Sequence, residues 1–380
     1  MRTTHALMAG PPTMLSSAEV VGLLGWPLGD SELPGQPALH PKQTGAPKNL
    51  TQVRRPFAVT TGPGKDVLFG LGRDDSRQHA LLIGPTGVGK SNAMAAMTLD
   101  AIEDGRGVLV IDPKGDLIEN DILPRIPADR RDDVVVIDPT SDRPVGINPL
   151  ANSARHPELV ADSILAVFRT LYKDSWGPRL EDVLHSALLT LARTPGATLT
   201  MLPALLTDPA TRRRLTANLR DPVGLEPFWR SYEAMSPEQQ AQVIAPVLNK
   251  LRPYLLRTTL RRTLGQADPA FDLSQLFSER RIILVKLNKG VLGEGSRLLG
   301  ALIVSQLWPL VLARAAVPQE KRHTVNVVID EVQDYLALPG DLGDSLRKRE
   351  VSASASSSAT NSASSSRHSC SQASTPTRAP

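Results

Sequence analysis

The sequence contains little of what several large protein classes require. Its one cysteine, Cys370, excludes a disulfide framework or a cysteine metal site within one chain and fits a reducing cytosol. No basic stretch followed by an apolar one stands at the start, so we expect no signal peptide. The longest apolar stretch, residues 298–313, is interrupted by Ser305, Gln306 and Pro309 and is shorter than the roughly 20 residues of a membrane span. We expect it to form a buried helix.

Neither sign of charge dominates the sequence. It has 43 Lys and Arg residues against 39 Asp and Glu residues, a net charge of +4 and a pI near 9.3. This excess is compatible with an anionic partner but is too small to indicate one. The 380 residues, 41% of them hydrophobic, allow one large domain or two of ordinary size.

Short apolar runs that end at Gly, Pro or Asp recur in two parts of the chain. They lie at residues 79–84 (HALLIG), 108–113 (VLVIDP), 133–139 (DVVVIDP), 281–287 (RIILVKL) and 325–331 (VNVVIDE). Runs of this length, rich in Val and Ile, are typical of parallel strands that are covered on both faces. With a helix expected over residues 91–101, they predict an α/β fold whose single parallel sheet is assembled from both ends of the chain.

The stretch between these two groups of runs has a different pattern. Its apolar positions recur at helical spacing, as in Leu159, Ile164, Val167, Phe168 and Leu171, and it contains no strand-like run, so it predicts an all-helical insertion. Residues 205–265 hold ten Lys or Arg against five Asp or Glu. Such a balance fits either solvated helix faces or a surface that faces nucleic acid or another subunit.

Residues 84–91, GPTGVGKS, fit the P-loop pattern G-x-x-x-x-G-K-[ST]. In such a loop, backbone N–H groups surround the β-phosphate, Lys90 reaches the β- and γ-phosphates, and Ser91 ligates magnesium. The motif follows an expected strand and begins a helix, so the phosphates would lie at a helix N-terminus. The sequence therefore predicts a site for ATP and Mg²⁺ formed by Gly84, Pro85, Thr86, Gly87, Val88, Gly89, Lys90 and Ser91.

Hydrolysis also needs an acidic residue at the end of a neighbouring strand. VNVVIDE supplies Asp330, which would hold magnesium together with Ser91, and Glu331, which would polarise the attacking water. We therefore predict Lys90 and Glu331 as the catalytic residues. An Asp-Glu pair is typical of ATPases that do mechanical work. The segment DPKGD, with Asp112 and Lys114, follows another strand at the edge where ligands bind in open α/β sheets, although a simple turn explains it equally well.

The separation of the two motifs, about 240 residues, is far longer than the few βα units between them need, which again indicates the insertion. Residues 1–55 are rich in Pro and Gly and predict a loosely structured segment. Residues 56–150 and 275–345 would form the P-loop ATPase domain, and residues 151–274 the all-helical insertion. Residues 346–380 form a Ser-rich, low-complexity tail.

Several segments, taken in their order along the chain, resemble one protein family. They are GPTGVGKS, VLVIDPKGDLIEN, VVVIDPTSDRPVGINPL, DSWGPRLEDVL, IAPVLNKLRPYLLR, IILVKLNKGVLGEGSRLLGALI and VVIDEVQDYL. Together they are similar to the conjugative DNA transfer ATPases of type IV secretion systems, the TraG-like coupling proteins within the HerA and FtsK class. The resemblance covers residues 80–345 and implies a RecA-like P-loop domain with a helical insertion, assembled as a homo-hexamer. It also implies ATP-driven movement of DNA toward secretion-channel proteins.

Two features depart from the family pattern. Family members usually carry a membrane anchor or an extended N-terminal region, and none is visible, so membrane association would come through partners or a missing segment. The expected location is the cytoplasm, peripheral at the inner face of the cell membrane. After the Asp-Glu strand, the family continues with a helix, an Arg-Gly and a core strand ending in His-Gln, whereas this chain continues as VSASASSSATNSASSSRHSCSQASTPTRAP.

The tail has two explanations. Back-translation from Asp344 with G or C in third positions, read two bases along, gives LAAQARGLGLGLLLGHQQ, a family-like continuation that indicates a shifted reading frame. A genuine disordered tail is the alternative. The sequence thus leaves three functions open: a DNA-translocating motor, a secretion-system assembly ATPase acting on channel proteins, and a truncated copy that binds ATP but hydrolyses it poorly.

Overall fold

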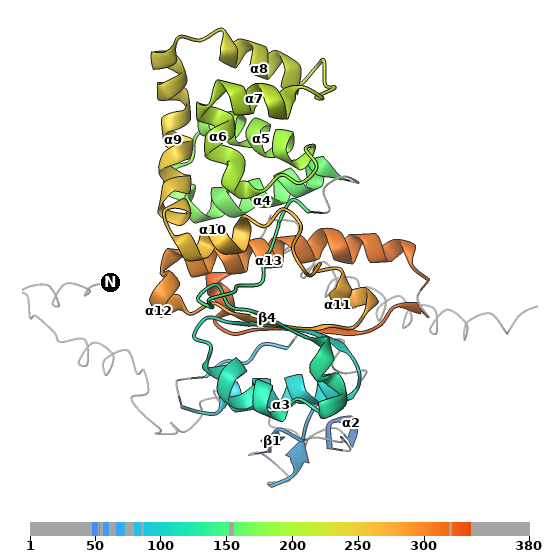
Figure 1. Ribbon diagram of the computed structural model, residues 1–380. Helices are drawn as coiled ribbons and strands as arrows, with labels where there is room; N and C mark the ends of the chain where they lie inside the picture. The colour runs from blue at the N-terminus through green and yellow to red at the C-terminus, as the bar shows by residue number, and fades with distance from the viewer. Residues whose placement is uncertain are drawn as a thin grey trace, which may run out of the picture. The chain divides into compact units, whose positions relative to one another are not determined.

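The computed structural model describes residues 48–51, 53, 56–60, 66–72, 80–84, 87–151, 156–318 and 321–335 (Figure 1). The chain divides into two compact units, Met1–Gly70 and Leu71–Pro380. In the first unit, helix α2 (Lys48–Thr51) accompanies an antiparallel pair of short strands, β1 (Ala58–Val59) and β2 (Leu68–Phe69). The rings of Phe57 and Phe69 pack with their centroids 5.9 Å apart.

The second unit contains a four-stranded sheet in the order β4-β5-β3-β6. The strands are β3 (Gly107–Asp112), β4 (Val134–Ile137), β5 (Ile282–Lys286) and β6 (Val325–Ile329), and every pairing is parallel. Ile111 of β3 lies between Val285 of β5 and Ile329 of β6. The predicted α/β fold class and the assembly of one sheet from both ends of the chain are confirmed.

Alternating side chains of the central strands divide the core into two layers. Val108 and Val110 of β3 contact helix α3 (Lys90–Glu103) and the π-helical turn η2 (Leu117–Ile122), and Leu109 and Ile111 face the opposite layer. That layer holds the long helix α13 (Glu294–Ala313) and helix α4 (Pro157–Leu171). Figure 1 shows α3 on one side of the sheet and α13 on the other. Burial on both faces explains why these strands read as continuous apolar runs.

Between β4 and β5 the described residues form helices and no strand. The longer ones are α4, α5 (Pro178–Ala192), α6 (Leu202–Thr207), α7 (Pro209–Thr216), α8 (Leu225–Glu233), α9 (Pro237–Leu255) and α10 (Thr258–Leu264), followed by the short α11 (Gln275–Ser278). Several begin with Pro at a first-turn position, where its missing N–H has no intrahelical partner. Ser236 and Gln239 form a capping box at the start of α9. The predicted helical insertion is therefore present, while its boundaries at residues 151 and 274 stay a prediction.

Single turns of 3-10 helix connect many of these elements. They are η3 (Leu123–Arg125), η4 (Ala128–Asp133), η6 (Lys173–Ser175), η7 (Leu199–Met201), η8 (Arg314–Ala316) and η10 (Val332–Asp334). The helical turn α12 (Lys289–Leu292) joins β5 to α13. The turns η2 and α12 both follow the carboxyl end of a strand, so they border the edge of the sheet where the site lies.

The prediction of a strand at residues 79–83 is wrong for residues 80–83, the part that the structure describes. Residues 80–83 are irregular, and Leu81 and Ile83 are 72% and 85% exposed. Helix α3, which follows them, packs against β3 and β6. Within the described residues β6 lies at the edge of the sheet, and its outer edge has no paired strand. An apolar run without a hydrogen-bonded neighbour is not held as a strand, which explains the difference.

Helix α13 is the one described helix that is long and apolar enough to cross a membrane by length and composition alone. It starts four residues before the apolar stretch noted in the sequence. Its first half lies in the protein core, with Leu298, Leu299 and Leu302 at most 2% exposed, and it packs against α4. The predicted buried helix is therefore confirmed over this half, whereas Val311 and Leu312 near its end are exposed.

Candidate nucleotide site

The described part of the P-loop has the backbone that phosphate binding requires. Gly87 and Gly89 have φ angles of +87° and +89°, a left-handed conformation that suits glycine. Gly89 is the N-cap of α3, and no side chain caps this helix end. The first backbone N–H groups of an α-helix have no intrahelical partner, and this end of α3 therefore favours an anion. Pro85 and Thr86 lie outside the described residues.

Lys90 is the first residue of α3, and its side chain turns back over the loop. Its Nζ donates a hydrogen bond to the carbonyl oxygen of Gly84 at 2.8 Å. The ammonium group therefore lies at the mouth of the loop, where the β- and γ-phosphates of a nucleotide would meet it. Ser91, the next residue, is exposed. Val88, in the middle of the loop, is 59% exposed, as expected for a position whose backbone, and not its side chain, contacts the ligand.

Asp330 and Glu331 follow β6 directly, and the pairing of β6 with β3 fixes where they lie. The N–H of Asp330 donates to the carbonyl oxygen of Ile111 at 3.0 Å, which extends the ladder by one bond. Glu331 has a φ of +51°, and its N–H donates to Oδ1 of Asp330 at 2.9 Å. This left-handed residue is the N-cap of the helical turn η10 that follows. The structure thus brings the two predicted acids to the carboxyl edge of the sheet, beside α3.

Asp112, at the end of β3, is 1% exposed and has a structural role. Its carboxylate accepts hydrogen bonds from the N–H groups of Lys114 at 2.9 Å and Ile118 at 3.1 Å. These bonds fix the turn that leads into η2, so the simple-turn explanation of DPKGD holds for Asp112. Lys114 differs, because its Nζ lies 3.6 Å from Oε1 of Glu331. The sequence singled out Lys114 but did not indicate this pairing.

The charges at this edge fit a divalent cation. Burial raises the pKa of Asp330 above its ordinary value, and the neighbouring carboxylates of Asp112 and Glu331 raise it further, whereas the hydrogen bond from the Glu331 N–H and the charge of Lys114 lower it. A cation would offset this accumulated negative charge. The described residues include no group of three or more His, Cys, Asp or Glu side chains that could hold a metal by themselves. Mg²⁺ commonly takes one or two carboxylates and completes its ligands with phosphates and water, and Asp330 with Ser91 fits that pattern.

A second polar cluster at the same edge was missed by the sequence analysis. Lys286, the last residue of β5, contacts the carboxylates of Asp138, at 3.1 Å, and Glu119. Asn288 donates to Thr140 at 2.6 Å and to Asp138 at 3.2 Å. Although burial acts to raise the pKa of Asp138, its bonds to Thr140 and Lys286 hold it below the ordinary value. The one signal in the sequence that could have indicated this cluster was Lys286, a lysine near the end of the apolar run at residues 281–287.

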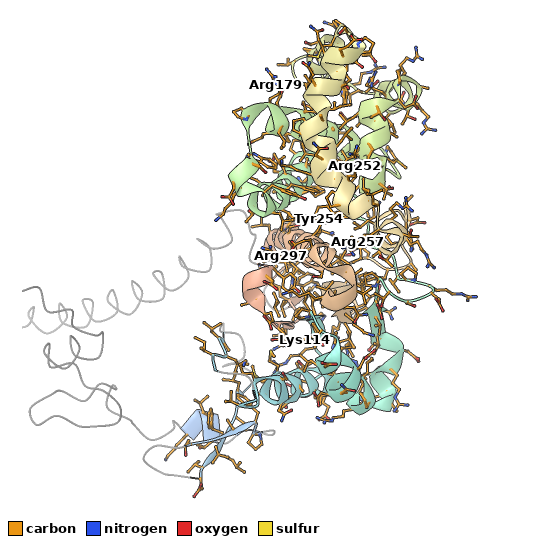
Figure 2. All side chains as sticks on the ribbon, turned by 90° about the vertical axis from the view of Figure 1, so that its left-hand side faces the viewer. Lys114, Arg179, Arg252, Tyr254, Arg257 and Arg297 are labelled. Carbon is orange, nitrogen blue, oxygen red and sulfur yellow. The ribbon has the colours of Figure 1, made fainter. Side chains whose placement is uncertain are left out.

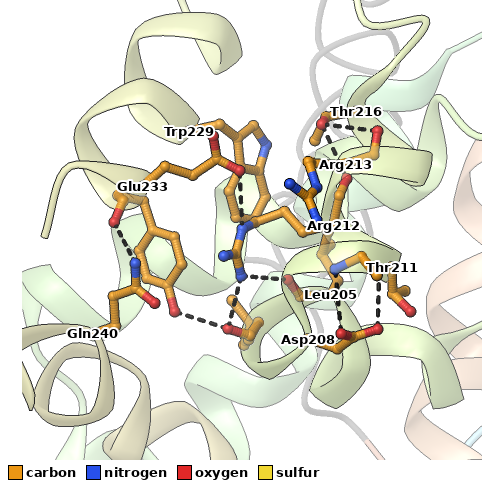
Figure 3. Close-up of polar contacts among 12 residues, drawn as sticks. Leu205, Asp208, Thr211, Arg212, Arg213, Thr216, Trp229, Glu233 and Gln240 are labelled. Atoms are coloured by element: carbon orange, nitrogen blue, oxygen red, sulfur yellow. Dashed lines mark hydrogen bonds and ion pairs between the residues drawn. The ribbon is translucent and has the colours of Figure 1, made fainter. Parts of the chain in front are cut away.

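The basic residues of the helical insertion have different roles. Arg212 is 2% exposed: its Nε lies 3.3 Å from Glu233, its Nη1 donates to the carbonyl oxygens of Leu205 and Leu206, and its guanidinium lies over the ring of Tyr232 (Figure 3). It therefore joins α6, α7 and α8 and is unavailable to a partner. Arg212 therefore fits neither alternative given for this region, since it lies neither on a solvated helix face nor on a surface open to nucleic acid or another subunit.

Other cations lie on one face of the second unit. Figure 2 shows Arg179, Arg252, Arg257, Arg297 and Lys114 spread over the face turned to the viewer, from the helical insertion down to the end of β3. Among the described residues, no carboxylate forms a salt bridge with Arg179, Arg252 or Arg257, and all three are exposed. This basic face adjoins the sheet edge that carries Glu331.

The comparisons with known proteins agree with the motif resemblance. A family model described as "Helicase HerA, central domain" matches residues 61–307, more than half of the chain. The match includes the P-loop and the helical insertion, and it ends before β6. No curated protein matches the sequence.

Among solved structures, the chain is similar to the bacterial conjugative coupling protein TrwBdeltaN70 in its unbound form, with 16% identity and a TM-score of 0.46 over 76% of this chain and 62% of that one. It is also similar to the plasmid coupling protein TrwB in complex with ADP and Mg²⁺, with 17% identity and a TM-score of 0.43 over 78% and 70% of the two chains.

The chain thus spans less than two thirds of the unbound coupling protein, and likeness at these scores carries no argument about its ligands or activity. The family model is different, because it matches most of the second unit at the level of sequence, around the P-loop whose geometry is described above. The chain belongs to the family of the helicase HerA central domain.

Proposed function

We propose that the chain is an ATP-binding motor that couples ATP hydrolysis to DNA translocation in conjugation or type IV secretion. The observation that carries the proposal is the nucleotide site: left-handed Gly87 and Gly89 lead into α3, whose first residue is the folded-back Lys90, and α3 packs against the strand that Asp330 follows. The family is named for a helicase, and helicases act on nucleic acid.

Each residue of the site has a role in this proposal. The P-loop from Gly84 to Ser91 binds the phosphates of ATP, and Lys90 neutralises the charge that develops on the β- and γ-phosphates. Ser91 and Asp330 hold Mg²⁺, which when bound draws charge from the transferred phosphoryl group. Glu331 accepts a hydrogen bond from the attacking water and orients it toward the γ-phosphate.

The basic face supports DNA as the substrate. Arg179, Arg252 and Arg257 are exposed cations without a salt bridge among the described residues, and Figure 2 places them on the same face as Lys114 beside the nucleotide edge. Guanidinium groups bind phosphates in two-pronged hydrogen bonds, which fits a backbone-directed, sequence-independent grip. A homo-hexamer with its insertion facing the DNA, docked on secretion-channel proteins at the inner face of the cell membrane, is part of the proposal.

Two measurements test the motor proposal. ATP turnover by the full chain should be stimulated by DNA, should fall steeply as salt rises because phosphate contacts release counterions, and should vanish in Lys90→Ala. Replacing Arg252 and Arg257 together by Gln should lower the slope of log affinity for DNA against log salt by about 0.9 per lost contact. The pair Arg213→Gln and Arg214→Gln, exposed on α7, is the matched control. Turnover that ignores DNA, with intact Lys90 dependence, would favour the secretion-system assembly ATPase acting on channel proteins.

A second candidate is a copy that binds ATP but hydrolyses it slowly. The outer edge of β6 favours it: this strand lies at the sheet edge of the described residues, Val327 is 44% exposed, and residues 80–83 are not paired with it. Asp330 and Glu331 are then supported by one neighbouring strand only. Sequencing the encoding DNA across residues 344–380 tests the shifted frame, and a fluorescent ATP analogue that binds normally without turnover would establish this candidate.

A further inference from the structure

A cavity of about 830 Å³ lies on the α13 side of the sheet, remote from the P-loop along the chain. It is bordered by the second half of α13, the start of α4, the segment around α11 and the residues just before β6. The nucleotide site, in contrast, lies where β6 ends. The walls are mostly apolar and include Ile147, Val160, Ile164, Phe271, Phe277 and Leu310. Its volume is in the range of about 300–1,000 Å³ that is typical of small-molecule pockets.

One face of α13, continued by Arg314 at the start of η8, lines the cavity with a polar group at each end. Gln306, Pro309, Leu310, Ala313 and Arg314 all border it, at spacings of three and four residues that bring them to one side of a helix. Nε2 of Gln306 is buried and has no hydrogen-bond acceptor among the described residues. At a rise of 1.5 Å per residue, Gln306 and Arg314 are separated by roughly 12 Å along the helix.

Arg314 is a half-buried cation without a carboxylate. Its guanidinium lies 4.7 Å from the centroid of the Phe277 ring, and it donates to the carbonyl oxygen of His323. No acidic side chain among the described residues forms a salt bridge with it. Burial, together with the charge of Arg322, lowers the pKa of Arg314, as expected for a cation whose surroundings favour a counter-charge. A half-buried guanidinium without a carboxylate can take an anion as its counter-charge.

The rim of the cavity is positively charged, as Arg314 is. Lys321 and Arg322 border it, together with His156 and His323, and among the described lining residues Asp272 is the one with an acidic side chain. The carboxylate of Asp272 already accepts a hydrogen bond from the N–H of Ser274 at 2.6 Å. The cavity therefore offers hydrogen-bond donors and positive charge around an apolar floor.

We propose that this cavity binds an amphipathic organic anion, whose acidic group contacts Arg314 and whose apolar body lies along Pro309 and Leu310 toward the amide of Gln306. The chemical class is an aromatic or aliphatic carboxylate, sulfonate or phosphate monoester. Charge complementarity selects this occupant over a neutral apolar molecule, because a neutral ligand would bury Arg314 further without supplying a counter-charge. The inference is independent of the nucleotide site.

Two dyes that differ by one acidic group provide the test on the full chain. 8-Anilinonaphthalene-1-sulfonate carries a sulfonate, and N-phenyl-1-naphthylamine has the same rings without it. Fluorescence titration should give one saturable site per chain for the sulfonate dye, with an affinity about tenfold or more above that of the neutral dye, since hydrogen bonds to charged groups are the stronger ones. Equal affinities for the two dyes would overturn the proposal.

Variants separate this cavity from other surfaces. Arg314→Gln should remove the difference between the dyes, and Val160→Phe, which narrows the cavity from α4, should weaken both. Arg213→Gln on α7 and Lys90→Ala in the P-loop should leave both affinities unchanged. Near-ultraviolet circular dichroism establishes that each variant is folded. An unchanged sulfonate affinity in folded Arg314→Gln, loss of binding in Lys90→Ala, or a stoichiometry that falls as the chain self-associates would each refute it, the last because a second copy would then cover the cavity.

Discussion

The ammonium group of Lys114 lies 3.6 Å from Oε1 of Glu331 and joins the turn after β3 to the residue that follows β6. Both side chains are partly exposed, 63% for Lys114 and 36% for Glu331, so the pair contributes little to the stability of the fold. Its effect is local. Lys114 also lowers the pKa of Asp330, the proposed magnesium ligand, against the burial and the carboxylates that raise it.

Replacing Lys114 by Ala should therefore strengthen Mg²⁺ binding at this edge and leave the fold intact. Without this cation, Mg²⁺ no longer meets a positive charge beside the carboxylates of Asp330 and Glu331. We expect the Mg²⁺ concentration for half-maximal binding of a fluorescent ATP analogue to fall about three- to tenfold, equivalent to about 1 kcal/mol. Lys114→Arg should behave like the unchanged chain. Lys173→Ala, an exposed lysine in η6, is the control, and an identical Mg²⁺ titration for Lys114→Ala would show that the pairing has no role.

Gly89→Ala tests whether the P-loop binds nucleotide. Gly196→Ala is its control, because it causes similar backbone strain away from the P-loop. The φ of +89° is unfavourable for alanine by about 1–2 kcal/mol, and the added Cβ meets no atom of the described residues within 4 Å. Gly196, in the helical insertion, has a φ of +70° and equally open surroundings. Both variants should lose similar unfolding free energy in urea, whereas nucleotide affinity should fall more than about tenfold in Gly89→Ala only. Equal nucleotide affinities in the two variants would show that the P-loop does not contribute to nucleotide binding.

Arg212→Met and Arg213→Met test the division of the basic residues into structural and exposed ones. Loss of the Arg212 guanidinium leaves the carbonyl oxygens of Leu205 and Leu206 without this donor, which should lower the unfolding free energy by about 1–3 kcal/mol. Arg213, exposed on the same helix, should change it by less than about 0.5 kcal/mol. Urea unfolding followed by circular dichroism measures both. A small effect at Arg212 would contradict its structural role.

Much of the fold could be predicted because local pattern and tertiary structure agree. Runs such as VLVIDP are apolar on both faces, and β3 is indeed covered by α3 on one side and by α13 on the other. The prediction failed at residues 80–83, because a strand depends on a hydrogen-bonded neighbour as well as on its own side chains. The P-loop helix and the Asp-Glu turn were visible because their chemistry lies in consecutive residues.

The pairs that join distant segments were not visible. Lys286 contacts Asp138 and Glu119, the latter 167 residues earlier in the chain, and nothing local in the sequence indicates which acids a lysine at the end of a strand will meet. The same holds for Arg212, whose burial results from the packing of α8 on α7. In the sequence, Arg212 cannot be told from its exposed neighbours, because all are arginines in one basic run. Charge composition therefore indicates a basic region but cannot divide it into ligands and structural residues.

Asp330→Asn should stabilise the chain while weakening its magnesium site. The folded pKa of Asp330 is raised above its unfolded value, so the ionised carboxylate opposes folding at pH values above the folded pKa. The asparagine variant should therefore have the higher unfolding free energy at pH 7 without Mg²⁺ and nucleotide. This advantage should disappear as the pH falls below the unfolded value of 3.8, where Asp330 is protonated in both states. Urea unfolding at several pH values measures it, and a variant that is less stable than the unchanged chain at pH 7 would show that burial does not penalise this carboxylate.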